Sequence, residues 1–132
     1  MTGKEYIRNA FLLKENDRPA WLPFVGCHGA FLTGETADIY LSSAEKIVKG
    51  LEEAIVKYTP DGLPVTFDLQ LEAEALGCRL LFSPSNPPAV VSHPVEEGLP
   101  VDELPDFSEI LRRREGRMGE ALRAAGIITS RH

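Results

Sequence analysis

One long amphipathic segment lies between two short apolar runs, and this order constrains the fold more than any other feature of the chain. The segment at 42–58, SSAEKIVKGLEEAIVKY, has apolar side chains at helical spacing and begins with Ser42 and Glu45 at capping-box spacing, so it predicts a helix. The runs AWLPFVG at 20–26 and LPVTF at 63–67 predict buried strands. Strand, helix and strand in this order favour a parallel βαβ unit.

The remaining elements are predicted from the same kinds of signal. Thr2 and Glu5 also have capping-box spacing, and they begin a predicted helix that stops near Glu15. The other expectations are an irregular loop at 26–41, a short helix at 70–76, two strands around a proline-rich turn within 78–94, an extended linker at 95–107, a helix at 108–125 and a further strand from 127. A length of 132 residues suits one core, so residues 1–132 are assigned to a single domain.

The charge balance bears on the classes of partner. The formal net charge is −6, from 20 acidic and 14 basic residues, which argues against nucleic-acid binding. The basic cluster RRREGR at 112–117 is predicted to be a solvated helix face. No apolar run approaches the roughly 20 residues that cross a bilayer, and the first residues lack the features of a signal peptide. We therefore expect no membrane partner and a cytoplasmic location.

The two cysteines, Cys27 and Cys78, fit no close metal-binding spacing. A disulfide is not expected in a cytoplasmic protein. Both are therefore predicted to be small buried thiols. His93, which precedes Pro94, is predicted to have a structural role.

Carboxylates follow the second apolar run directly. In VTFDLQLEAEALGC at 65–78, Asp68 ends the predicted strand, and Glu72 and Glu74 come soon after it. A charge beside a buried strand is costly unless it is paired, solvated or used. Asp68 is therefore either a cap for the short helix that follows or a working group at the mouth of a site. A pairing of Asp68 with Glu72 would raise the pKa of one of them and allow proton transfer.

Four stretches of the chain occur in the order found in a known superfamily. FDLQLEAEALGC at 67–78 resembles a segment of the uroporphyrinogen decarboxylase and corrinoid methyltransferase superfamily, and is closest to its methylcobalamin:coenzyme M methyltransferase branch. DRPAWLPF at 17–24 is similar to the family's opening strand, and PPAVVSHPV at 87–95 to the segment after its first hairpin. EGRMGEALRAAG at 115–126 is similar to a helix in which members carry a Gly-Arg pair.

The resemblance implies a fold and an incomplete chain. Members of this superfamily fold as (β/α)₈ TIM-type barrels with the site at the carboxyl ends of the strands. A complete barrel needs about 250 residues, so the fold class expected here is α/β, the N-terminal part of such a barrel. Because an open parallel sheet exposes an unpaired edge, we expect a homo-oligomer or a complementary barrel half as partner.

The resemblance also implies a function and a set of site residues. The expected reaction moves a methyl group between a corrinoid and a thiol acceptor, with a corrinoid protein or a tetrapyrrole small molecule as partner. Asp68 is the expected catalytic residue. The expected substrate-binding residues are Phe24, His28, Gly29, Phe67, Gln70 and Glu72. Zinc and a corrinoid are implied for the full-length family member, but the family's His-x-Cys pair is missing here, so no metal is assigned to this chain.

Two alternatives remain open at this stage. One is a uroporphyrinogen decarboxylase-type enzyme of heme biosynthesis, which acts on a tetrapyrrole. In that branch an arginine after the first strand binds substrate carboxylates, whereas FVGCHGAF at 24–31 contains no arginine. The other alternative is a non-catalytic half-barrel or fragment that binds a partner subunit or a tetrapyrrole.

Overall fold

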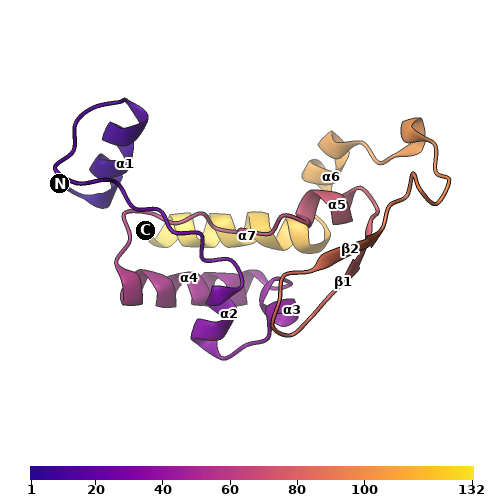
Figure 1. Cartoon of the computed structure of the whole chain (residues 1–132), viewed down its shortest axis with the longest axis horizontal. Helices are drawn as coiled ribbons and strands as arrows, with labels where there is room; N and C mark the ends of the chain where they lie inside the picture. The colour runs from indigo at the N-terminus through magenta and orange to yellow at the C-terminus, as the bar shows by residue number, and fades with distance from the viewer.

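The chain is mainly helical and contains a single β-hairpin (Figure 1). The computed structural model describes residues 1–132. Its elements are α1 (Gly3–Phe11), α2 (His28–Thr33), α3 (Ala37–Tyr40), α4 (Ala44–Tyr58), α5 (Leu71–Ala75), β1 (Arg79–Leu81), β2 (Ala89–Ser92), the 3₁₀ turn η1 (Val101–Glu103), α6 (Phe107–Arg113) and α7 (Gly116–Arg131). None of these helices combines the length and the apolar character that crossing a bilayer requires.

The helix α4 supplies most of the core. Its Ile47 and Leu51 are fully buried, and Val25, Tyr40 and Ala124 pack in the same cluster. The amphipathic pattern predicted this helix correctly. Its cap lies one residue later than expected, because the Ser43 hydroxyl accepts the hydrogen bond from the backbone N–H of Lys46.

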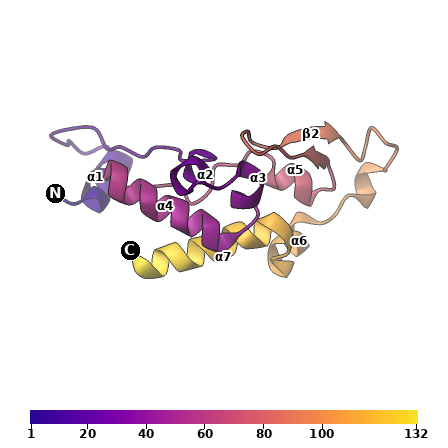
Figure 2. The same ribbon diagram turned by 90° about the horizontal axis from the view of Figure 1, so that it is seen from below.

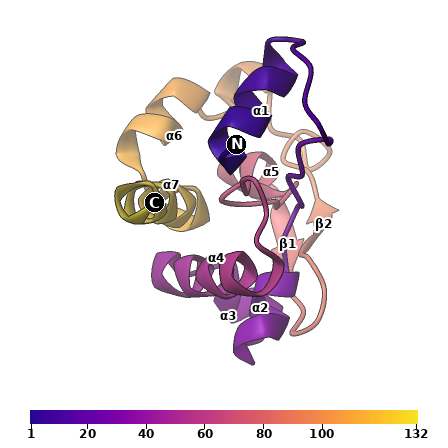
Figure 3. The same ribbon diagram turned by 90° about the vertical axis from the view of Figure 1, so that its left-hand side faces the viewer.

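The helix α7 lies beside α4 and runs in the same direction (Figures 1, 2 and 3). At one end, the carboxylate of Glu120 accepts a 2.7 Å hydrogen bond from the backbone N–H of Ala44. At the other end, Arg131 forms a 2.6 Å ion pair with Glu52. A side chain of α7 therefore satisfies one of the free N–H groups at the start of α4.

The predicted helix at 108–125 is two helices in the structure. Arg114, with φ 53°, ends α6 in the left-handed conformation, and α7 begins two residues later. The prediction of a strand from 127 is wrong, because α7 continues through Gly126. Ile127 and Ile128 pack against the core, and this burial offsets the low helix propensity of the glycine. The predicted linker at 95–107 contains η1 and the first residue of α6.

The expected fold class, the N-terminal part of a (β/α)₈ barrel, is wrong. The one sheet has two antiparallel strands, β1 and β2, with Arg79 opposite Ser92 and Leu81 opposite Ala89. This hairpin confirms the two strands predicted within 78–94. The expected strands at 20–26 and 63–67 are extended but belong to no sheet.

Proline gives a physical reason for the two missing strands. Pro23 lies inside the first run and Pro64 inside the second. Each proline lacks the N–H that a ladder requires. The predicted irregular loop at 26–41 also differs, since it contains α2 and α3.

An ion pair attaches α1 to the segment after α4. Arg18 donates two hydrogen bonds of 2.7 Å to the Asp61 carboxylate and stacks on the ring of Tyr6, 3.8 Å from its centre. The backbone N–H of Trp21 donates to the same carboxylate. The hydrogen bonds from Arg18 and then from Trp21 lower the pKa of Asp61 from 3.8 to about 2.

This pKa predicts how α1 responds to acid. A carboxyl group with a lowered folded-state pKa stabilises the fold above its ordinary pKa, and that contribution is lost as the pH falls through the folded pKa. We expect the attachment of α1 to weaken between about pH 4 and pH 2. Hydrogen exchange of residues 3–11 measures it, and Asp61→Asn should show weak protection already at neutral pH. Equal protection in both proteins would contradict this role.

Candidate functional site

Two extended segments, residues 20–25 and 63–68, run side by side in the same direction along α4 and α7 (Figure 1). At one end, the backbone N–H of Asp61 donates a 3.1 Å hydrogen bond to the carbonyl of Trp21. At the other end, Gly26 approaches the carbonyl of Phe67. No backbone hydrogen bond joins residues 20–25 to residues 63–68 themselves, so the two segments form no ladder.

The far ends of these segments carry an aromatic pair. The rings of Phe24 and Phe67 have centroids 4.5 Å apart, although the residues are 43 positions apart in the chain. Phe24 is 64% exposed and Phe67 is 42% exposed. We call this pair the aromatic wall. Large exposed rings of this kind favour contact with a flat apolar ligand or with another protein.

Asp68, next to the aromatic wall, is buried and fully engaged. Its side chain is 1% exposed, and Oδ1 accepts a 2.9 Å hydrogen bond from the backbone N–H of Gln70. Its Oδ2 accepts a hydrogen bond from Nη1 of Arg117 on α7. The carboxylate accepts its hydrogen bond just before α5 and pairs with a buried cation, so the structure does not place it at the open mouth of a site.

Arg117 is the centre of this charge cluster. Its side chain is 7% exposed, and Nε donates a 2.7 Å hydrogen bond to Glu74 on α5. The guanidinium carbon lies 5.1 Å from the centre of the Phe82 ring, while Nη2 is buried without a hydrogen-bond partner. The cluster therefore ties α7, α5, the end of the second extended segment and the hairpin region to one another.

The prediction that 112–117 forms a solvated face is wrong at Arg117, although Arg112, Arg113 and Arg114 are exposed. The position of Arg117 in the helix α7 places its side chain inward, against carboxylates that come from α5 and from the segment before it. A sequence signal existed in the Gly-Arg pair at 116–117. The identity of its partners depends on a tertiary contact 49 residues away in sequence.

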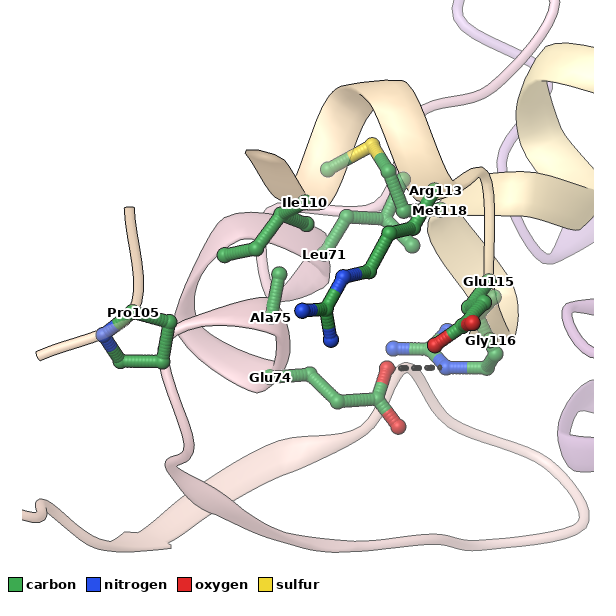
Figure 4. A pocket seen from close by; sticks show the side chains of 10 residues that line it. Leu71, Glu74, Ala75, Pro105, Ile110, Arg113, Glu115, Gly116 and Met118 are labelled. Carbon is green, nitrogen blue, oxygen red and sulfur yellow. Dashed lines mark hydrogen bonds and ion pairs between the residues drawn. The ribbon is translucent and has the colours of Figure 1, made fainter. Parts of the chain in front are cut away.

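A cavity of about 340 Å³ lies between α5, α6 and α7 (Figure 4). Its volume falls within the range of small-molecule pockets. Its apolar lining includes Leu71, Ile110 and Met118, and its charged lining includes Arg113 and Glu74. None of the expected site residues lines it, although Arg117, the partner of Asp68, does.

His28 and Gly29 begin α2 and have different surroundings. Nε2 of His28 lies 2.7 Å from the hydroxyl of Tyr58, and the imidazole stacks on the ring of Phe31 at 5.6 Å. Gly29 is buried against the ring of Tyr40. Its lack of a side chain makes room for this tyrosine, so Gly29 is closed to a ligand.

Gln70 and Glu72 are placed by α5. Gln70 precedes the helix as its N-cap, and its contact with Asp68 is made by its backbone N–H. Glu72 is exposed to solvent, and no hydrogen bond or ion pair joins it to Asp68. The carboxylate that joins the cluster is instead Glu74, through Arg117.

The thiol of Cys27 is half-buried. Burial raises its pKa, and the negative charge of Asp68 raises it further. This environment favours the neutral thiol, as expected for a structural cysteine.

Zinc, which the resemblance implies for a methyltransferase, does not fit these residues. No group of three or more His, Cys, Asp or Glu side chains is close enough together to hold a metal ion. We therefore derive no chemical step through zinc. Comparison of the chain with protein-family models, curated proteins and solved structures finds no match in any of the three.

Proposed function

We propose that this chain is a binding module that contributes one wall to the site of a macrocycle-dependent protein. The macrocycle is of the corrinoid or tetrapyrrole class, and the associated activity is methyl transfer of the kind implied by the resemblance. One observation carries the proposal. The exposed Phe24 and Phe67 rings lie together, and Asp68, which pairs with the buried Arg117, directly follows Phe67 in the chain.

The roles of the residues follow from their environments. Phe24 and Phe67 would stack against the face of the macrocycle, where offset aromatic contact contributes about 0.5–1.5 kcal/mol beyond burial. Asp68 would act as a positioning residue, since both its oxygens are hydrogen bonded to the protein. Turnover would then depend on groups contributed by another polypeptide.

Binding of a corrinoid or a porphyrin to the chain tests this proposal. We expect cyanocobalamin or coproporphyrin to quench the fluorescence of Trp21, the one tryptophan of the chain, which precedes Phe24 by three residues. Phe24→Ala or Phe67→Ala should each weaken binding about 3- to 10-fold. Phe11→Ala is the matched control, because Phe11 is 82% exposed on α1 and has no place in the wall.

The two probes also separate the candidate activities. Preference for cyanocobalamin supports the methyltransferase branch, and preference for coproporphyrin supports a decarboxylase-type protein. The absence of quenching by both, or an equal effect of Phe11→Ala, would contradict the proposed binding function.

A second function, association with protein, is favoured by a separate observation. The chain exposes 8520 Å², whereas a compact monomer of its mass, 14.5 kDa, exposes about 6,900 Å². The excess is comparable to the area that one partner buries in a large permanent interface. We infer that a second copy of this chain covers the exposed apolar side chains. Light scattering on the same samples decides this, and a monomer that unfolds cooperatively would contradict it.

A further inference from the structure

The hairpin brings a cysteine and a histidine together outside the candidate site. Cys78 directly precedes β1, and His93 directly follows β2. Since Arg79 pairs with Ser92, the antiparallel register places the next residues outward, Cys78 and His93, opposite each other. Sγ of Cys78 lies 3.5 Å from Nδ1 of His93.

Both side chains are accessible enough to react. His93 is exposed and Cys78 is half-buried. The neutral imidazole of a histidine accepts a proton from a thiol within hydrogen-bond range, and the resulting thiolate is the nucleophile. We propose that Cys78 is a reactive thiol, deprotonated by His93, that forms mixed disulfides with low-molecular-weight disulfides.

The proposed reaction is a thiol–disulfide exchange with His93 as the base. The proton of Cys78 moves to Nδ1 of His93, and the thiolate attacks one sulfur of the disulfide. A new bond forms between Cys78 and that sulfur, and the disulfide bond of the reagent breaks. The second half of the reagent leaves as a thiolate, which takes the proton back from His93. Cys78 is oxidised and the released half is reduced.

The other cysteine provides a comparison within the same chain. Cys27 has no histidine hydrogen bonded to it, and burial and the nearby carboxylate of Asp68 raise its pKa. The same reagent should therefore distinguish the two thiols.

No other charged group near Cys78 takes the role of His93 as a base. Arg79 on β1 forms a 2.7 Å ion pair with Glu97 in the turn after β2, and this pair is internally neutral. Glu74 on α5 is held by Arg117. The remaining charged residues on the adjoining elements are the exposed Glu72 and Glu96.

Glutathionylation of the full chain by oxidised glutathione, followed by mass spectrometry, tests the assignment. We expect one glutathione per chain in the wild type and in Cys27→Ala, and a rate at least about tenfold lower in Cys78→Ala. His93→Asn keeps a polar atom near Cys78 but removes the base. It should slow the reaction about tenfold below about pH 8 and remove the histidine inflection from the pH–rate profile. His132→Asn, at an exposed histidine far along the chain, is the matched control.

Two results would overturn the proposal. The first is modification of Cys27 at the same rate as Cys78. The second is a rate and a pH profile that His93→Asn leaves unchanged or lowers equally at every pH, since a purely structural histidine would act in that way. Urea unfolding of each variant confirms that the compared proteins are folded, and iodoacetamide gives the same comparison with an irreversible reagent.

Discussion

Replacing Arg117 with methionine is expected to lower the free energy of unfolding by about 3–5 kcal/mol. The change leaves the carboxylate of Asp68, with a side chain 1% exposed, without its cation. Removing one partner of a buried ion pair costs more than the pair contributes, because the remaining charge stays desolvated. This is the largest single effect we expect, and it is a large fraction of the roughly 5–15 kcal/mol by which small domains are stable.

The partners of Arg117 should show graded effects. Asp68→Asn keeps an acceptor for the backbone N–H of Gln70 and leaves Arg117 paired with Glu74, so we expect a loss of about 1–3 kcal/mol. Glu74→Gln acts on a side chain that is 34% exposed and should cost less than about 1 kcal/mol.

Urea unfolding of the three variants and of Asp68→Leu/Arg117→Met measures this order. The double variant should recover much of the loss, because both buried charges are removed together. Equal losses in the three single variants, or no recovery in the double variant, would show that the cluster does not act as a buried pair.

Gly29→Ala is expected to destabilise the chain by about 1–3 kcal/mol. A Cβ at this position would lie 2.5 Å from Cζ of Tyr40. The same ring also packs closely on Gly50, where a Cβ would lie 2.5 Å from Cε2 of Tyr40, so both glycines flank the tyrosine. Tyr40 is 2% exposed, and its burial raises the pKa of the phenol to about 12.

Gly126→Ala is the matched control for this substitution. Gly126 lies within α7 with open space around it, so alanine should stabilise the chain by about 0.5–1 kcal/mol through its higher helix propensity. The two variants should therefore shift the urea midpoint in opposite directions. A neutral Gly29→Ala would mean that the Tyr40 site is looser than its geometry indicates.

Local signals predicted the elements that depend on local interactions. The capping box of Thr2 and Glu5 begins α1, and apolar spacing gives α4. The proline-rich turn between two short apolar runs gives the hairpin. In each case the residues that determine the structure are close in sequence.

The predictions that failed depend on contacts between distant residues. The glycine-rich stretch at 26–41 forms two helices in which Tyr40 packs against Gly29 and Gly50, a contact that no local pattern reveals. Apolar composition at 20–26 and 63–67 indicated strands, but Pro23 and Pro64 weaken a ladder that would have to join them. The sequence marks Asp68 as a special position but predicts a solvated helix face for its partner Arg117.

The attachment of α4 to α7 has a consequence for synthesis on the ribosome. The N–H of Ala44 donates its hydrogen bond to the carboxylate of Glu120, 76 residues later in the chain. Ala124, also on α7, packs in the core with residues of α4. The first half of the chain therefore emerges with its apolar face uncovered, and long sequence separation of this kind slows folding. A nascent chain that stalls before α7 would expose Ile47 and Leu51 to chaperones.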